Sequence, residues 1–156
     1  WHEAHGGRMV DFAGWKMPVQ YASIVDEHLA TRQAAGLFDV SHMGRLSIEG
    51  PQALLWLESL LTRRVTGIEP GRVRYTLIAS TDPAVILDDA LVSRDRDAAD
   101  GTPRMGLVVN ASNRARVVAW LRSPRDSAPT RRRGGGKIRP VFRTRRACGA
   151  AAIRRP

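Results

Sequence analysis

The fold is decided by two apolar runs, Val73-Arg74-Tyr75-Thr76-Leu77-Ile78-Ala79 and Val85-Ile86-Leu87-Asp88-Asp89-Ala90-Leu91-Val92. Both are rich in the β-branched and aliphatic residues that fit a pleated, half-buried surface. The connection between them, Thr81-Asp82-Pro83, has the composition of a turn. The two runs therefore predict an antiparallel hairpin, and this hairpin is the centre of the fold.

Helices and further strands flank the hairpin. Helices are predicted from the N-cap candidate Ser23 to a stop at Gly36, over the apolar face from Ala53 to Leu61, and from a cap at Ser112 through Leu121. Strands are predicted at Arg8–Phe12, Arg45–Glu49 and Met105–Val109. This order predicts an α+β fold, with a mixed, largely antiparallel sheet and packed helices.

The charge of the chain divides it into two unlike parts. Residues 122–156 contain 12 Lys or Arg and one acid, a net charge of +11. Residues 1–121 contain 13 Lys or Arg and 14 Asp or Glu, a net charge of −1. The total of +10 is therefore a property of the last 35 residues, and the predicted folded part is nearly neutral.

These counts predict two regions, a folded domain over 1–121 and a basic, low-complexity, disordered tail over 122–156. The tail has no sustained apolar period. It can therefore bury too little apolar surface to offset the conformational entropy that it would lose on folding. Two interpretations remain open: a basic arm that binds nucleic acid, or a tail without selected structure, such as the product of a shifted reading frame. We favour the second, and we expect limited trypsin digestion to leave a core that ends near Arg122.

The remaining composition points to a globular protein with a real core. The chain has 156 residues, 43% of them hydrophobic, which suits one domain. It has no apolar run of membrane-spanning length and no visible secretory signal, so we expect no membrane association and a cytoplasmic location. Its single cysteine, Cys148, excludes an internal disulfide.

Asp88 and Asp89 interrupt an otherwise apolar strand. Neighbouring side chains on a strand point to opposite faces, so one of the two carboxylates must face whatever the sheet covers. A buried carboxylate is costly unless it is paired or hydrogen-bonded. The pair therefore marks either a polar pocket or a structural hydrogen-bonding site, and the residues alone leave both open.

Two other polar stretches are candidates. His42, in Phe38-Asp39-Val40-Ser41-His42-Met43-Gly44, is a possible base or a structural residue. Asn110 lies where a strand meets a helix, and it offers a donor and an acceptor at a pocket mouth or a simple cap. The histidines follow no standard ligand spacing, so no metal site is predicted, and no glycine-rich phosphate loop is present.

Together these stretches resemble the N-terminal folate-binding region of the glycine cleavage T protein family, the aminomethyltransferases, from about His5 to Leu121. The resemblance rests on an ordered set of motifs: Arg8-Met9-Val10-Asp11-Phe12-Ala13-Gly14-Trp15, Met17-Pro18-Val19-Gln20-Tyr21, Glu27-His28, Ala34-Ala35-Gly36-Leu37 followed by the Phe38–Gly44 string, Leu61-Thr62, Pro70-Gly71, Tyr75-Thr76, Asp88-Asp89 and Val108-Val109-Asn110-Ala111-Ser112-Asn113.

The resemblance implies a reaction and a set of site residues. An aminomethyl group on the lipoyl arm of a partner, the H protein, gives its carbon to the co-substrate tetrahydrofolate, and ammonia leaves. The family's essential carboxylate maps to the Asp88–Asp89 pair, and we assign it to Asp89 as the pocket-facing acid. Met43, Tyr75 and Asn110 match positions that line the folate pocket.

The chain also departs from the family pattern. The family usually has Gly-Gly before the acid pair, where this chain has Pro83-Ala84, and Ser123–Pro156 matches no part of the family's second half. We interpret the chain as a truncated N-terminal fragment without full activity. The alternatives are a folate-binding iron–sulfur assembly module, for which Cys148 lies in the wrong place, and a non-enzymatic protein whose basic tail binds nucleic acid non-specifically and salt-dependently.

Overall fold

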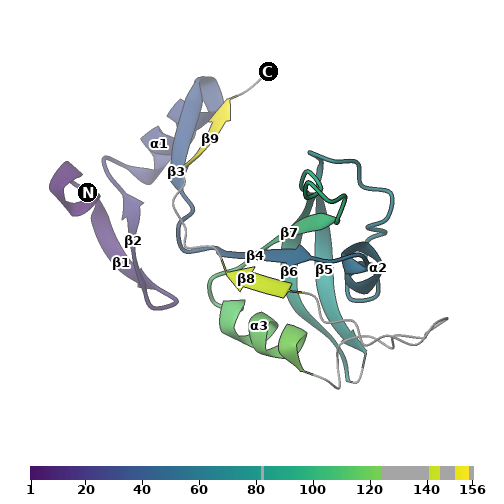
Figure 1. Cartoon of the computed structure of the whole chain (residues 1–156). Helices are drawn as coiled ribbons and strands as arrows, with labels where there is room; N and C mark the ends of the chain where they lie inside the picture. Colours follow the sequence, from purple (N-terminus) through teal and green to yellow (C-terminus); the bar gives the residue numbers. More distant parts are fainter. Residues whose placement is uncertain (82, 124–140, 145–149, 155–156) are drawn as a thin grey trace. The chain divides into compact units, whose positions relative to one another are not determined.

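The computed structural model describes residues 1–81, 83–123, 141–144 and 150–154. The chain divides into two compact units (Figure 1), and each is described by itself. The N-terminal unit comprises Trp1–His42 with Ala147–Pro156, and the sheet unit comprises Met43–Arg146. Among the described residues, no helix is long and apolar enough to cross a membrane.

The N-terminal unit consists of two small antiparallel strand pairs and one α-helix. Its elements are the 3₁₀ turn η1 (Glu3–His5), β1 (Arg8–Phe12), β2 (Trp15–Gln20), α1 (Ile24–Gln33), β3 (Ala35–Asp39) and β9 (Ala150–Arg154). Strand β1 pairs with β2, and β3 pairs with β9. The β1–β2 turn holds Ala13 and Gly14 at φ of 53° and 79°, a conformation that glycine adopts without strain.

The predicted helix begins where expected and ends earlier. Ser23 caps α1, because its Oγ accepts a hydrogen bond from the backbone N–H of Asp26 at 3.0 Å. The helix ends at Gln33, so Gly36 is not its stop and lies inside β3. The predicted strand at Arg8–Phe12 is confirmed, whereas β2 and β3 were not predicted.

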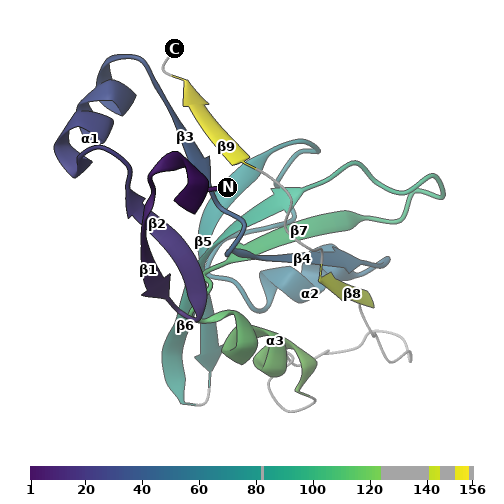
Figure 2. The same ribbon diagram turned by 90° about the vertical axis from the view of Figure 1, so that its left-hand side faces the viewer.

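The sheet unit is built on five strands in the order β5-β6-β7-β4-β8, and all neighbours are antiparallel. Figure 2 shows the long β5–β6 hairpin beside β7 and β4. The strands are β4 (Gly44–Glu49), β5 (Val73–Thr81), β6 (Ala84–Arg94), β7 (Arg104–Val109) and β8 (Val141–Thr144), and the helices are α2 (Ala53–Glu58) and α3 (Arg114–Arg122). The predicted hairpin and the α+β class are confirmed.

One face of this sheet carries the core. Its buried side chains pack with those of α2, α3 and the segment after α2 in a single cluster. Fully buried members are Ile48, Leu57, Val65, Ile78, Val92, Met105, Leu107, Val109 and Val117. The opposite face leaves large apolar side chains exposed, among them Val73, Tyr75 and Leu91. The sheet therefore presents a covered face and an open face.

Two helix boundaries differ from the sequence prediction. Helix α2 ends at Glu58, although Leu60 and Leu61 remain buried and Leu61 bridges Ile78 on the edge strand β5. Helix α3 begins after Asn113, so the predicted cap at Ser112 is wrong. The Asn113 side chain makes no capping hydrogen bond either: its Nδ2 donates to Asp88, and its Oδ1 accepts from Arg116.

Strands β8 and β9 lie within the region expected to be disordered. Most of residues 122–156 lies outside the described residues, so the expectation of a disordered tail stays a prediction there. The described segments 141–144 and 150–154 pair with β4 and β3. A strand edge recruits another segment through backbone groups, which needs no long apolar period in the recruited sequence.

Candidate functional site

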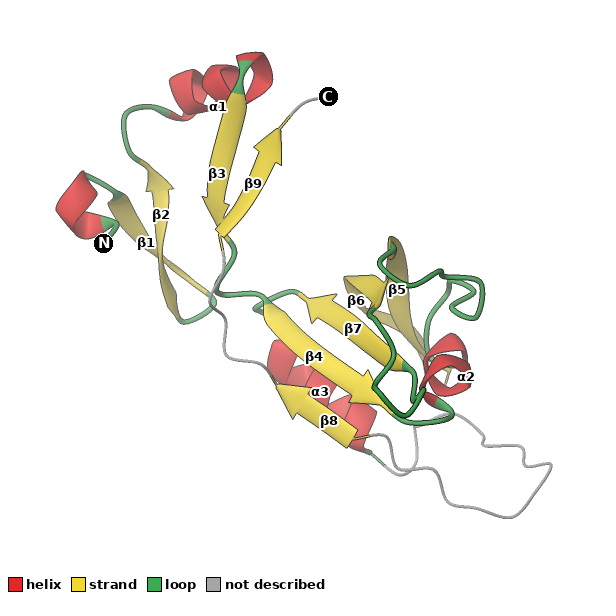
Figure 3. Ribbon diagram, turned by 45° about the horizontal axis from the view of Figure 1, so that its top comes forward, coloured by secondary structure: helices red, strands yellow, loops and turns green. Residues whose placement is uncertain are grey.

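Met43 and Asn110 lie where β4 begins and β7 ends, next to Asp89 in the middle of β6, and Tyr75 lies on the neighbouring strand β5. The register pairs Leu77 with Asp89, Ala90 with Val109, and Val109 with Gly44. Asn110 and Met43 are therefore one residue beyond the Val109–Gly44 pair, in line with Asp89. Tyr75 is two residues from Leu77 and shares the face of the Asp89 side chain. Figure 3 shows the end of β7 beside the start of β4, where this group lies.

The two adjacent carboxylates lie on opposite faces of β6. Asp88 is 3% exposed on the covered face, whereas Asp89 is exposed on the open face. The register of β5 and β6 shifts just before them, since Ile78 pairs with Asp88 but Ala79 pairs with Ile86. Leu87 is therefore the extra residue of a β-bulge, and Leu87 and Asp88 are both buried.

The buried carboxylate of Asp88 is fully hydrogen-bonded. Its Oδ2 accepts from the backbone N–H of Asn110 at 2.8 Å, and its Oδ1 accepts from the side-chain amides of Asn110 at 2.9 Å and Asn113 at 2.7 Å. These bonds replace the water that burial removed. Asp88 thus ties the end of β7 and the start of α3 to β6.

The side-chain amide of Asn110 connects the two carboxylates. The same Nδ2 that donates to Asp88 also donates to Oδ1 of Asp89 at 2.7 Å and to its backbone carbonyl at 3.1 Å. Bonds between an amide and a charged acceptor are stronger than neutral ones. Asn110 therefore holds the exposed Asp89 side chain at a fixed place on the open face.

Tyr75 completes this group from the neighbouring strand. Its ring is 56% exposed, so it presents an aromatic surface on the open face. Partial loss of water around its hydroxyl, the negative charge of Asp89 and a hydrogen bond to that carboxylate raise the pKa of Tyr75. The register agrees with this, because it pairs Tyr75 with Leu91 and Leu77 with Asp89 and so places the phenol and the carboxylate on one face of neighbouring strands.

A groove of about 410 Å³ opens beside Tyr75 at the edge of the sheet. It is lined by Thr62, Arg63, Arg64, Tyr75, Thr76 and Leu77. Arg63 Nε donates to the Tyr75 carbonyl at 2.8 Å, and Thr62 exchanges hydrogen bonds with Leu77. The site thus combines a carboxylate, an amide, an aromatic ring and two nearby guanidinium groups.

Comparisons with known proteins agree on one family. Residues 1–133 match the model of the GCVT N-terminal domain. The chain belongs to this family. It is 42% identical over 121 residues to the aminomethyltransferase of Bacillus subtilis (strain 168), and 45% identical over 123 residues to that of Chlorobaculum tepidum. These matches cover 78% and 79% of the chain.

The crystal structure of the glycine cleavage system aminomethyltransferase T from Bartonella henselae has the same architecture. It superposes with a TM-score of 0.69 at 38% identity and covers 77% of the chain. The chain spans 32% of that protein, and also 32% of the two curated relatives. The family resemblance read from the sequence is confirmed, and these relatives support neither the iron–sulfur assembly alternative nor the nucleic-acid-binding one. Cys148 lies outside the described residues.

Asp39 and Ser41, from the Phe38–Gly44 string of this GCVT-family chain, belong to a second polar cluster, in the N-terminal unit. The ring nitrogens of His2 bond to Oδ2 of Asp39 at 2.8 Å and to the Tyr21 hydroxyl at 2.6 Å. Oδ1 of Asp39 accepts from the backbone N–H of Ser41 at 2.8 Å. His42 packs edge-to-face on Phe12, with ring centroids 5.7 Å apart. His2 and Ser41, not His42, are thus the hydrogen-bond partners of Asp39.

The pKa of Asp39 gives a first testable prediction. Hydrogen bonds from the Ser41 side chain and backbone, followed by the bond to His2, lower this pKa from 3.8 to about 2. Because the folded-state pKa is the lower one, the stabilisation by Asp39 is present above about pH 4 and is lost between about pH 4 and 2. We expect Ser41→Ala to raise the Asp39 pKa more than His2→Ala does, measured by carbon NMR of the carboxyl group. A larger effect of His2→Ala would contradict this order of causes.

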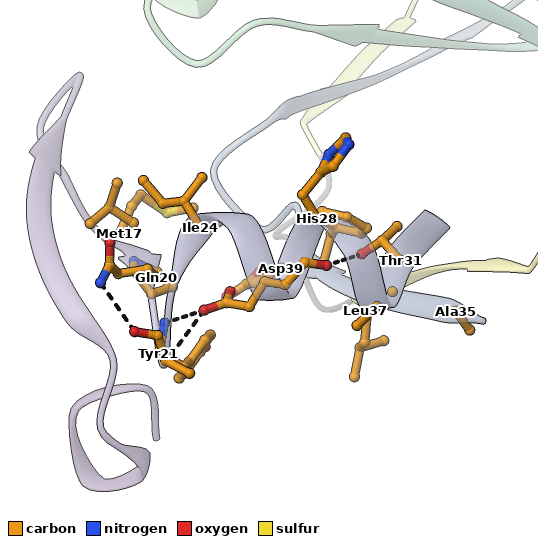
Figure 4. Close-up of a pocket in the computed structure, with 16 residues that line it drawn as sticks. Met17, Gln20, Tyr21, Ile24, His28, Thr31, Ala35, Leu37 and Asp39 are labelled. Atoms are coloured by element: carbon orange, nitrogen blue, oxygen red, sulfur yellow. Dashed lines mark hydrogen bonds between the residues drawn. The ribbon is translucent and has the colours of Figure 1, made fainter. Parts of the chain in front are cut away.

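A pocket of about 630 Å³ lies within the N-terminal unit, between β2, α1 and β3 (Figure 4). Several of its polar groups already have internal partners. Glu27 accepts from the backbone N–H groups of Tyr21 and Ala22 at 2.7 and 3.0 Å, and Thr31 donates to the Glu27 carbonyl. The pocket therefore offers mainly apolar walls, and none of the site residues assigned from the sequence lies in it.

Asn113, Arg116 and Arg63 contribute to the site in the sheet unit but were not predicted from the sequence. Asn113 belongs to the quoted Val108–Asn113 motif, so a signal was present, but its spacing suggested only a cap. Arg116 contacts β6 from α3, donating to the Leu87 carbonyl and, at 3.3 Å, to Oδ1 of Asn113. Its position in an exposed helical stretch gave no signal for these contacts.

Proposed function

We propose that this chain forms the N-terminal part of a tetrahydrofolate-dependent aminomethyltransferase of the glycine cleavage system. The observation that carries the proposal is the open face of the sheet in a GCVT-family chain, where Asp89 is held by Asn110 beside Tyr75. The substrates are tetrahydrofolate and the aminomethyl-lipoyl arm of the H protein. The relatives support this assignment by their name, aminomethyltransferase.

Each residue of the group has a separate task in this proposal. The exposed aromatic ring of Tyr75 and the adjacent Leu91 form an apolar wall for the flat pterin ring. Met43, at the start of β4, extends this wall. The Asp89 carboxylate faces the folate nitrogens and stabilises the positive charge that develops as they attack the carbon of the aminomethyl group. Asn110 keeps the carboxylate in position, which lowers the cost of orienting it during reaction.

The chain supplies only one side of such a site. It spans 32% of its curated relatives, and the open face is not covered by other described residues of the sheet unit. A pterin bound there keeps its other face in water, so much of the binding free energy is lost. We expect the 156-residue chain alone to bind tetrahydrofolate more weakly than micromolar, measured by titration calorimetry. Micromolar or tighter binding would mean that the tail or a second copy completes the site.

A chimeric enzyme tests the proposal directly. Residues 1–121 are fused to the part of the Bacillus subtilis aminomethyltransferase that follows its region of similarity. With H protein carrying the aminomethyl group and tetrahydrofolate, this chimera is expected to form 5,10-methylenetetrahydrofolate and ammonia. The matched control is the Bacillus subtilis C-terminal part alone. A folded chimera without turnover would contradict the proposed function.

A further inference from the structure

We propose that Asn113 and Arg116 are positioning residues that fix Asp89 through a continuous chain of hydrogen bonds. The chain runs from Arg116 to Asn113, to the buried Asp88, to Asn110 and finally to Asp89. Its importance for catalysis rests on the proposed role of Asp89. The positioning of Asp89 by this chain of hydrogen bonds does not depend on that proposed role, so it can be tested without folate.

Asp88 is a buried carboxylate with few possible partners. This carboxylate is 3% exposed, and within the described part of the chain its hydrogen bonds come from N–H groups of Asn110 and Asn113. A buried carboxylate that loses one donor must find another or move. The orientation of the Asn110 amide, which shares Oδ1 of Asp88 with Asn113, thus depends on the position of Asn113.

Asn110 is the link to the exposed carboxylate. Its single Nδ2 donates to Oδ1 of Asp88 and Oδ1 of Asp89. An amide has two N–H groups on this nitrogen, one for each carboxylate. If Asp88 shifts, the amide rotates and the bond to Asp89 weakens, which leaves Asp89 free to turn into water.

Arg116 connects this chain of hydrogen bonds to helix α3. Arg116 sits one turn beyond Asn113, and its guanidinium donates to Oδ1 of Asn113 and to the carbonyl of Leu87. Leu87 is the extra residue of the bulge, whose carbonyl is not needed for the ladder. Arg116 therefore orients the Asn113 amide and holds the bulge next to Asp88 at the same time.

The test reads the position of Asp89 in the full 156-residue chain through the pKa of Tyr75, which the Asp89 charge raises. The chain has two tyrosines, so Tyr21→Phe leaves Tyr75 as the only titrating phenol in an ultraviolet pH titration. In this background, Asp89→Asn is expected to lower the Tyr75 pKa. Asn113→Ala is expected to give a Tyr75 pKa between that of the Tyr21→Phe parent and that of Asp89→Asn. In this variant Asp89 keeps its negative charge, but its carboxylate is no longer held next to Tyr75. Ser112→Ala, at the exposed neighbouring position, is the matched control and is expected to change nothing.

A second measurement protects the test against a variant that fails to fold. Arg116→Ala does not remove any donor of Asp88, so it is milder, and the Asn110 side-chain amide resonance can be followed by nitrogen NMR. We expect this resonance to move in Arg116→Ala and to move further in Asn113→Ala, and to stay in place in Ser112→Ala. An unchanged Tyr75 pKa with an unchanged Asn110 resonance in the folded variants would overturn the inference. Movement of both with an inactive chimera would uphold it and count against the proposed function alone.

Discussion

Asp89→Asn in the chimeric enzyme is expected to lower turnover by roughly 10²–10³-fold, the usual effect of removing one positioned electrostatic interaction. The amide keeps the size of the side chain and one acceptor, but it loses the negative charge that favours a cationic transition state. Because Asp89 is exposed on the open face, the change leaves the core of the sheet intact. The measurement is kcat and KM for methylenetetrahydrofolate formation, and KM for tetrahydrofolate is expected to change far less than kcat.

The adjacent acid provides the matched control for this experiment. Asp88→Asn makes the same chemical change at the neighbouring residue, whose side chain points to the covered face. Its effect is expected chiefly on stability, with a loss of turnover that is smaller than in Asp89→Asn, because Asp88 acts on Asp89 only through the Asn110 amide. Loss of turnover in a folded Asp88→Asn enzyme, with turnover retained in Asp89→Asn, would reverse the assignment of the two carboxylates. A change of only a few-fold in both would remove the catalytic role from the pair.

Asp88→Ala is expected to destabilise the whole chain by about 2–4 kcal/mol, the largest stability effect that we predict for the sheet unit. The change leaves the backbone N–H of Asn110 and the side-chain amides of Asn110 and Asn113 without their shared acceptor in a buried place. It also leaves a small cavity between β6 and α3. Urea unfolding followed by tryptophan fluorescence measures the free energy of unfolding.

Asp89→Ala is the control for this stability prediction. Asp89 is exposed, and water replaces its bond to Asn110, so its removal is expected to change the free energy of unfolding by no more than about 0.5 kcal/mol. Equal losses in Asp88→Ala and Asp89→Ala would mean that the buried hydrogen bonds contribute less than their geometry indicates.

The centre of the fold could be predicted because its strands carry their own pattern. The runs at Val73–Ala79 and Val85–Val92 are apolar and separated by turn residues, and they form the β5–β6 hairpin. The strands β2 and β3 were missed for a physical reason. Gly14 and Pro18 are residue types that usually interrupt a strand, but Gly14 serves the turn, and Pro18 lies in a two-stranded pair, where a strand has only one partner and a missing N–H is tolerated.

The pairing of β8 and β9 could not be predicted at all. Their partners are the open edges of β4 and β3, so their conformation is set by a distant part of the chain and not by their own sequence. The same limit applied to α1, which ends before Gly36 because Ala35–Asp39 pairs with β9.

The site could be predicted only in part. Alternation along β6 placed Asp88 and Asp89 on opposite faces, but periodicity could not tell which face is open. The family resemblance assigned Met43, Tyr75 and Asn110 to one pocket, and the register explains how residues so far apart in sequence come to lie on neighbouring strands of one sheet. The roles of Asn113 and Arg116 were not predicted, because local residue spacing does not indicate a hydrogen bond between residues that are 25 positions apart.

The bulge at Leu87 has a consequence for how the chain tolerates changes in length. On a regular strand, inserting or deleting one residue reverses the facing of every side chain that follows it. The bulge leaves Leu87 unpaired, so the pairing register of β5 and β6 at the hairpin tip differs by one residue from the register at Asp88 and Asp89. Deleting one residue between Ala84 and Leu87 would therefore be absorbed by loss of the bulge, with each acid still on its own face. After Asp89 the strand pairs without a bulge, so deleting one residue there would turn the following side chains of β6 to the opposite face.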